Sequence, residues 1–330
     1  MVDTVITNAL LPSGPGTASL EFESLSDVVE MVSKTETPFM SNMKKGSAKA
    51  IKEEWGTETI GTVTAAVARS IGFVAAPTAQ VANRRLDNYL QLVAEEGGVS
   101  HTMDKLDAAD DTNTYEHKLL KSGILLRRKI NKLLHTPQAK DGTIATPKMG
   151  TPPAYVQATL FFGAAGTPGV VGAGTGADIP TVGTTPDDFD TIVPLDTVLE
   201  ASTQFNGDPD TLYLSPRMKR LFSRIPDASI ADNQVNTTAG ARTPFKHIGV
   251  ADAYLSDFGY IETVMDIDCP NTDIKVVDHD WTELLVLPGM DFADYELGTK
   301  GSAKEYMIEW QGTYRNKLPE SFLYINGYKA

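Results

Sequence analysis

The stretch from Arg84 to Thr136 constrains the fold most, because it ends in one long amphipathic helix. The acidic residues 107–114 can cap free N–H groups at the start of that helix, and their charge suits the positive end of the helix dipole. Pro137 ends it. A helix over Asp110 to His135 is roughly 39 Å long at 1.5 Å per residue, close to the diameter of a small domain. Apolar residues recur along it at steps of three and four, namely Tyr115, Leu119, Leu126, Ile130 and Leu133 or Leu134, with Leu120 and Ile124 widening the stripe.

The C-terminal half of this helix is basic. Arg127, Arg128, Lys129 and Lys132 lie where positive charge suits the dipole, which favours a solvated face over a nucleic-acid patch. Gly123, in the middle of the helix, costs about 1 kcal/mol relative to alanine.

The composition permits a large folded protein but indicates no specific chemistry. The 330 residues can bury a sizeable core in two lobes. A net charge of −14 argues against tight nucleic-acid binding, which needs a basic footprint. The single cysteine, Cys269, excludes an internal disulfide. The N-terminus lacks the pattern of a signal peptide, and no run reaches the roughly 18 apolar residues of a membrane span.

The N-terminal region predicts an arm followed by a short helix. Residues 1–20 are small and polar and are typical of a flexible arm. Thr37-Pro38 ends the helix that follows, because the residue before proline avoids helical geometry. The apolar face of this helix is Leu25, Val28, Val29 and Val32. Beyond it come an apolar patch at Phe39, Met40 and Met43 and a basic surface patch at Lys44, Lys45, Lys49 and Lys52.

Residues 56–82 differ from the rest of the chain. A strand over residues 51–55 leads into them, threonine, alanine, valine and glycine dominate, and Glu58 and Arg69 carry the only charges. Two β arms of about 13 residues would each reach roughly 40 Å. A lone apolar hairpin is marginally stable and prone to aggregate unless it is covered. The residues alone leave open whether it packs on its own chain or on a neighbour.

The remaining chain alternates helices and strands, which indicates the α+β class. Residues 141–186 are rich in glycine, proline and threonine and predict a loop-rich excursion, whose glycines lack the Gly-Lys-Ser/Thr ending of a phosphate loop. A helix follows Pro194, and a strand at Thr211–Leu214 leads to a helix that starts at Ser215-Pro216. Residues 227–246 are a polar loop. Strand patterns follow at 249–256, 259–267, 273–278 and 283–288, then at Tyr306, Ile308, Trp310 and Tyr314 on one face of a long strand, and last at Phe322 to Tyr328.

No residue pattern indicates catalysis or a cofactor. Cys269 and His279 would form a nucleophile pair only within hydrogen-bond reach of each other, and no third orienting group is apparent. We interpret Asp266 and Asp268, and likewise Asp187 and Asp188, as solvated strand-edge and helix-cap residues. The five histidines lack zinc-site spacing. We therefore expect no metal and no cofactor.

The order of these features resembles the major capsid proteins of tailed bacteriophages with the Hong Kong 97-type fold, in the branch with a short N-terminal arm. The resemblance covers about residues 35–330 and includes no catalytic motif. Its carriers are Thr37-Pro-Phe-Met40, the strand ending at Trp55, residues 56–82, Asn88-Tyr89, Asp104 to Leu134, Gly207-Asp-Pro-Asp210, Ser215-Pro216, Tyr254-Leu-Ser-Asp-Phe-Gly259 and Gly301-Ser-Ala-Lys-Glu-Tyr-Met-Ile-Glu-Trp310.

The resemblance implies a domain organisation built around a spine helix. It assigns the long helix to a peripheral domain and places the loop 227–246 at the five-fold and quasi-six-fold axes. The implied parts are an N-terminal arm (1–55), an extended loop on an adjacent subunit (56–82), a peripheral domain (83–139), an insertion loop (140–190), an axial domain (191–290) and the C-terminal strands of the peripheral domain (291–330).

The implied function is self-assembly, as pentamers and hexamers, into an icosahedral virion capsid that encloses double-stranded DNA. The resemblance also implies assembly in the host bacterial cytoplasm and weak contact with the packaged DNA. The implied partners are a separate scaffolding protein, a cement protein and a portal. Residues 56–82 contain no lysine, unlike family members that cross-link through this loop, so we expect a non-covalent shell. About 20 residues precede the first helix, so we expect any scaffold to be a separate chain. The expected assembly contacts are Trp55, Arg69, Phe73, Val74, Arg127 and Arg128.

Three alternatives stay open from sequence. An encapsulin-like compartment would have the same fold but package enzyme cargo. A hydrolase would use Cys269, His279 or an acidic pair. A β-rich adhesin or tail component would form trimers or fibres in place of closed shells.

Overall fold

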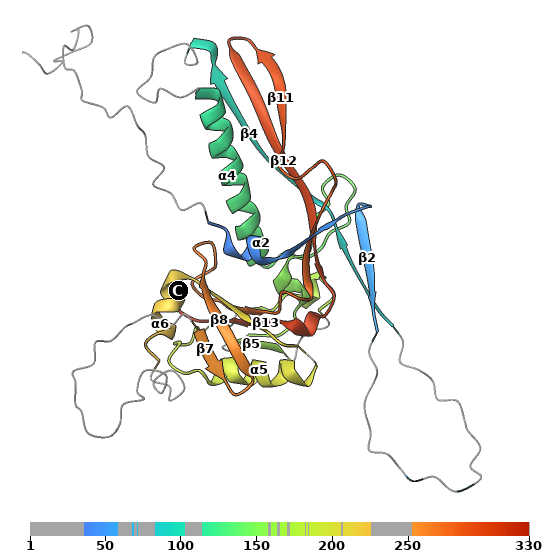
Figure 1. Cartoon of the computed structure of the whole chain (residues 1–330), viewed down its shortest axis with the longest axis vertical. Helices are drawn as coiled ribbons and strands as arrows, with labels where there is room; N and C mark the ends of the chain where they lie inside the picture. Colours follow the sequence, from blue (N-terminus) through green and yellow to red (C-terminus); the bar gives the residue numbers. More distant parts are fainter. Residues whose placement is uncertain are drawn as a thin grey trace, which may run out of the picture.

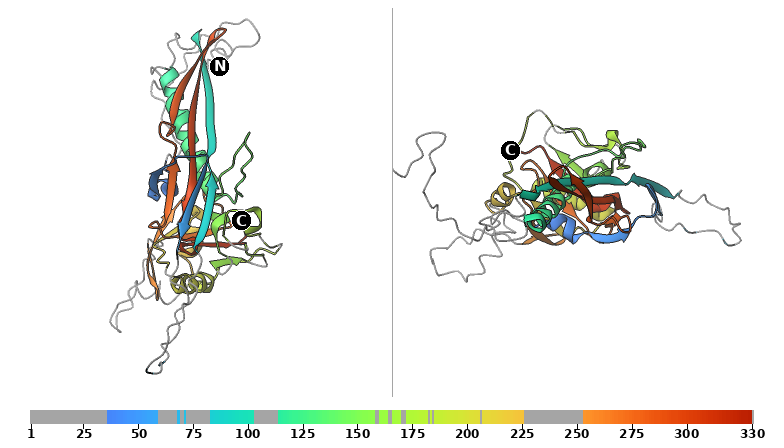
Figure 2. Two further views of the ribbon diagram at one scale, coloured as in Figure 1. Left: turned by 90° about the vertical axis from the view of Figure 1, so that its right-hand side faces the viewer. Right: turned by 90° about the horizontal axis from the view of Figure 1, so that it is seen from above.

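A long helix and a long sheet lie side by side and meet a second sheet at one end of the molecule (Figure 1). Figure 2 shows the long strands and the helix running together along the molecule's long axis. The arm 1–35, most of the loop 56–82 and the loop 227–246 lie outside the described residues. The structure, a computed structural model, describes residues 36–58, 68, 71, 83–102, 114–157, 160–163, 166–169, 172–181, 183, 185–205, 207–225 and 253–329.

The long sheet is built around β12 (Ala303–Asn316), which pairs antiparallel with β4 (Gln91–Ser100), β11 (Ala293–Lys300) and β10 (Thr282–Val286). β1 (Lys44–Ser47) adds to β10 in parallel. The alternation predicted for β12 is confirmed, since Tyr306, Ile308, Trp310 and Tyr314 are all buried. Tyr306 meets Tyr115 of the long helix edge to face, at 5.4 Å between the ring centroids.

The long helix is α4 (Thr114–His135), and it covers one face of the long sheet (Figure 1). Leu126, Ile130 and Leu134 are fully buried, which confirms the predicted apolar face. Leu120 is different: its side chain is 58% exposed although it continues the apolar stripe. The predicted acidic cap lies almost wholly in residues 103–113, outside the described part of the chain.

The second sheet holds most of the core. Its strand order is β5 (Phe161–Gly163), β13 (Phe322–Asn326), β9 (Ile274–Val277), β6 (Thr211–Leu214), β8 (Gly259–Met265) and β7 (Ala253–Ser256). Every residue of β6, β9 and β13 is buried, because neighbours cover both faces of these strands. α5 (Val193–Gln204) and α6 (Pro216–Phe222) pack beside this sheet, and Ser215 caps α6 by accepting from the backbone N–H of Met218 at 3.2 Å.

The two sheets do not divide at residue 290, where the sequence placed a boundary. β10 precedes that point but lies in the long sheet, and β13 follows it but lies in the second sheet. The chain therefore crosses between the two sheets more often than that boundary implies. Part of the 140–190 segment is also core: η1 (Pro152–Tyr155) is buried throughout, and η3 (Gly176–Asp178) packs next to it.

Candidate assembly surfaces

A two-stranded ladder forms the base of the loop predicted to reach a neighbour. β2 (Lys52–Thr57) pairs antiparallel with β3 (Arg84–Tyr89) (Figure 1). Of residues 59–82, which connect the two strands, the structure describes positions 68 and 71. The ladder is tied to the rest of the chain by Arg84, whose guanidinium lies 2.8 Å from the carboxylate of Glu320. The base is therefore a fixed support for whatever the loop contacts.

Trp55, an expected assembly contact, anchors this ladder within its own chain. Its side chain is 8% exposed, and its Nε1–H donates to the carbonyl oxygen of Asn316 at 2.7 Å. Its ring lies 6.2 Å from that of Tyr155, centroid to centroid. Trp55 therefore stabilises the β2–β3 ladder within its own subunit, because little of its side-chain surface is exposed to contact a neighbour. Three other expected contacts, Arg69, Phe73 and Val74, lie outside the described residues.

A buried polar cluster joins α4 to the second sheet. Asp266 is fully buried, and its carboxylate accepts from Asn131 Nδ2 at 2.9 Å and lies 3.0 Å from His135 Nε2. The interpretation of Asp266 as a solvated strand-edge residue was therefore wrong. Arg128, another expected assembly contact, pairs with Asp268 at 2.8 Å. The sequence shows these residues only as isolated polar positions, because their partners are more than 130 positions away.

The charges in this cluster follow from burial and hydrogen bonding. Burial lowers the pKa of His135 and outweighs its hydrogen bond to Asp266, so the ring is neutral. Burial alone would raise the pKa of Asp266, but the hydrogen bonds from His135 and Asn131 lower it below the usual value. His135 Nδ1 is buried and has no partner among the described residues, which fits a neutral ring that carries its proton on Nε2. The carboxylate of Asp266 is thus held by neutral side-chain donors, next to the Arg128–Asp268 ion pair.

Cys269 and His279, the residues that the hydrolase alternative would use, have separate partners. Cys269 is buried, with its Sγ 3.9 Å from Lys275 Nζ, and burial raises its thiol pKa to about 11. His279 Nε2 hydrogen bonds to the hydroxyl of Tyr213 at 2.7 Å. A thiol with that pKa is a poor nucleophile at neutral pH. The geometry gives no nucleophile and base pair at these positions.

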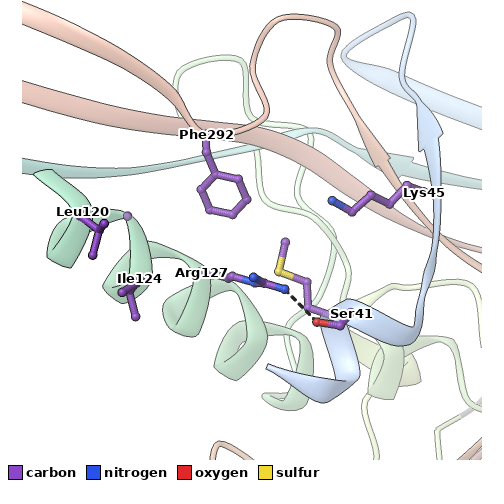
Figure 3. Close-up of a pocket in the computed structure, with 8 residues that line it drawn as sticks. Ser41, Lys45, Leu120, Ile124, Arg127 and Phe292 are labelled. Atoms are coloured by element: carbon purple, nitrogen blue, oxygen red, sulfur yellow. Dashed lines mark hydrogen bonds between the residues drawn. The ribbon is translucent and has the colours of Figure 1, made fainter. Parts of the chain in front are cut away.

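A groove runs between α4 and α2 (Pro38–Asn42), and Phe292 lies over it (Figure 3). Its volume is about 410 Å³. Arg127, the last of the expected assembly contacts, lies at its edge and donates from Nη2 to Ser41 Oγ at 2.9 Å. Sequence reasoning did not find this groove, since it forms where three separate segments meet. Its lining residues are Met40, Ser41, Lys45, Leu120, Gly123, Ile124, Arg127 and Phe292.

Within the described part of the chain, no group of three or more His, Cys, Asp or Glu side chains is placed to hold a metal ion. No described helix is long and apolar enough to cross a membrane.

Solved structures with the same arrangement identify the fold as the Hong Kong 97-type capsid fold. The cyanophage A-1(L) capsid asymmetric unit matches with a TM-score of 0.67 at 14% identity, over 94% of this chain and 98% of that chain. Mycobacterium phage Bobi matches with a TM-score of 0.62 at 14% identity, over 94% and 96%. The holo-SrpI encapsulin complex from Synechococcus elongatus matches with a TM-score of 0.57 at 9% identity, over 93% of each chain. No curated protein sequence matches.

The family is narrower than the fold. The model of the SU10 major capsid protein family matches residues 3–329, and the chain belongs to this family. Its function is that of a bacteriophage major capsid protein, and its place is the virion capsid. The implied fold and the implied role as a phage major capsid protein are confirmed.

Proposed function

We propose that the chain assembles non-covalently, as pentamers and hexamers, into an icosahedral head that encloses double-stranded DNA. The observation that carries this proposal is the β2–β3 ladder, a support fixed by Trp55 and Arg84 at the base of a long apolar loop. A rigid base with an apolar extension suits exchange between subunits, because the neighbour buries what the subunit alone exposes. Many such modest contacts sum to a stable shell.

The proposed domain organisation keeps the arm 1–55, the extended loop 56–82, a peripheral domain around α4 and an axial domain around the second sheet. β10 is moved to the peripheral domain and β13 to the axial domain, since their strand partners lie there. Arg69, Phe73 and Val74 are proposed to contact the neighbour directly. Trp55 and Arg128 are proposed to act indirectly, because their described contacts are within their own chain.

The partners and setting are also proposals. Assembly takes place in the host bacterial cytoplasm with a separate scaffolding protein, a portal and a cement protein. The net charge of −14 supports weak contact with the packaged DNA, since like charges repel. The role is structural and needs no catalytic group, which agrees with the separate partners of Cys269 and His279.

Removing residues 60–79 tests the proposal. The shortened chain is expected to keep the circular dichroism spectrum of the folded subunit but to form no shells by sedimentation and negative-stain imaging. A variant with the same 20 residues in permuted order is the matched control for length and composition, and it should also fail to close shells. Normal shells from the deletion would refute the loop assignment.

The encapsulin-like compartment is the second candidate, because the SrpI encapsulin shares the fold over 93% of each chain. The content of purified particles separates the two functions. Packaged DNA supports the head, whereas a co-purifying enzyme supports the compartment.

A further inference from the structure

The groove between α2, α4 and Phe292 has an apolar lining that no described residue covers. Leu120, Ile124 and Phe292 line it (Figure 3), and the side chain of Leu120 is 58% exposed. Met40 belongs to the lining as well. Phe292 has a φ of 55°, a left-handed backbone conformation that bulky residues rarely adopt. The surrounding structure therefore holds the backbone at Phe292 in this conformation.

The rim of the groove is basic. Arg127 is exposed and bonds to Ser41, and it has no carboxylate partner among the described residues. Lys45 lies 3.7 Å from Asp291, and both side chains are about half exposed, so this pair is worth little. An occupant with an apolar face and negative charge would match both the lining and the rim.

The chain's own N-terminal segment has this composition. Residues 21–36 carry five acidic residues and one basic residue, Lys34, a net charge of −4. Leu25, Val28, Val29 and Val32 recur at helical spacing. From Leu25 to Val32 a helix rises about 10 Å, and so does α4 from Leu120 to Arg127, since each spans seven residue steps.

The point of attachment favours this occupant. The described chain begins at Glu36, four residues before Met40 in the groove wall. So short a connection gives an effective concentration of millimolar or more. A ten-residue helix is marginal by itself in water, so its formation would depend on the groove.

We propose that residues 24–33 of the same chain form a helix whose apolar face occupies this groove, with the acidic residues of the segment near Arg127 and Lys45. The groove is then an intrachain binding site for the N-terminal segment. This inference does not depend on the shell, because it concerns a single subunit.

Hydrogen–deuterium exchange on the full chain tests occupancy. Leu120→Asp puts a charge on the exposed edge of the groove, and Leu125→Asp is the matched control on the same helix, at a 44% exposed position outside the groove. The amides of residues 26–33 are expected to exchange at least about 10-fold faster in Leu120→Asp than in the wild type or Leu125→Asp. Equal exchange in all three proteins would overturn the proposal.

Substitutions in the N-terminal segment and at the groove rim give a second test by the same exchange measurement. Val28→Asp leaves the described fold untouched and should accelerate exchange by the same factor. Arg127→Glu should accelerate it as well, whereas Lys121→Glu, a charge reversal outside the groove, should not. Full protection in Val28→Asp would contradict the helix face assigned here.

Isotope-mixed cross-linking separates the same chain from a second copy. Light and heavy chains are mixed unfolded, refolded together and treated with a carbodiimide, which joins carboxylates to amines without a spacer. Cross-links from Asp27 or Glu30 to Lys45 are expected within light or within heavy chains. Links between light and heavy chains would show that the groove binds the N-terminal segment of a neighbouring chain. The absence of links to Lys45 would show that the segment does not bind in this groove. Either result overturns the proposal.

Discussion

The imidazole ring of His135 stacks on the ring of Phe39, with 4.6 Å between the centroids and 29° between the planes. His135 lies in the last turn of α4, and Phe39 lies in α2 next to the N-terminal segment. Through its hydrogen bond to Asp266, the same histidine reaches the end of β8 in the second sheet. One buried ring therefore fixes three parts of the subunit against each other.

Acid should destabilise the subunit through His135. Its pKa is lowered in the folded state by burial, so below about pH 6.5 the unfolded chain binds a proton that the folded chain does not. The free energy of unfolding should therefore fall as the pH falls from 7 to 5. The lowered pKa of Asp266 adds a second loss only below about pH 4. Chemical denaturation at several pH values measures both.

His135→Gln is the comparison for the pH series, because glutamine can still donate to Asp266. Its stability should depend less on pH between 7 and 5, whatever its absolute stability. The residual dependence should come partly from His279, whose pKa burial also lowers. An unchanged slope in the variant would exclude His135 as a source.

Asn131→Ala should be strongly destabilising. Asn131 is fully buried, donates to Asp266 and accepts the backbone N–H of Met40 at 3.1 Å. Alanine leaves the Met40 N–H without this acceptor and removes one donor from the buried Asp266 carboxylate, at a cost of about 2–4 kcal/mol. Lys121→Ala, an exposed change on the same helix, should stay within about 0.5 kcal/mol. Urea denaturation compares the two, and a small effect in Asn131→Ala would mean that water replaces the amide.

Two glycine substitutions should act in opposite directions. A Cβ at Gly123 meets only Ile308 Cδ1, at 3.8 Å, so Gly123→Ala should stabilise α4 by about 0.5–1 kcal/mol. A Cβ at Gly97 would overlap the ring of Tyr306, so Gly97→Ala should destabilise the long sheet. Thermal unfolding gives the sign of each change. A loss of stability in Gly123→Ala would show that the groove needs the space.

Cys269 should resist alkylation in the folded protein. A thiol pKa of about 11 in place of 9.0 lowers the thiolate fraction at neutral pH about 100-fold, and burial blocks the reagent further. Iodoacetamide labelling followed by mass spectrometry should modify the denatured chain and spare the native one. Rapid labelling of the native chain would revive the hydrolase alternative.

Local patterns were predictable from the sequence because they depend on near neighbours. The three- and four-residue spacing identified the face of α4 that buries Leu126, Ile130 and Leu134. Strict alternation identified β12, and an apolar run with a following Ser-Pro identified β6 and the start of α6. The family resemblance added the fold, which periodicity alone does not specify.

The candidate site was less predictable. The sequence led us to expect Trp55, Arg127 and Arg128 as assembly contacts, and it did not show that Trp55 is buried in its own subunit or that Arg128 pairs with Asp268. It interpreted Asp266 as solvated, although that carboxylate is fully buried. A polar residue looks the same in a sequence whether its partner is water or a distant side chain.

The sequence by itself determined the elements, their order and the acidic charge of this protein. Only the tertiary structure decided which strand joins which sheet, where Trp55 finds Asn316, and that Met40, Leu120 and Phe292 share one groove. The physical reason is range: helix and strand periodicity arise from residues a few positions apart, whereas pairing and burial of polar groups depend on partners brought together from anywhere in the chain.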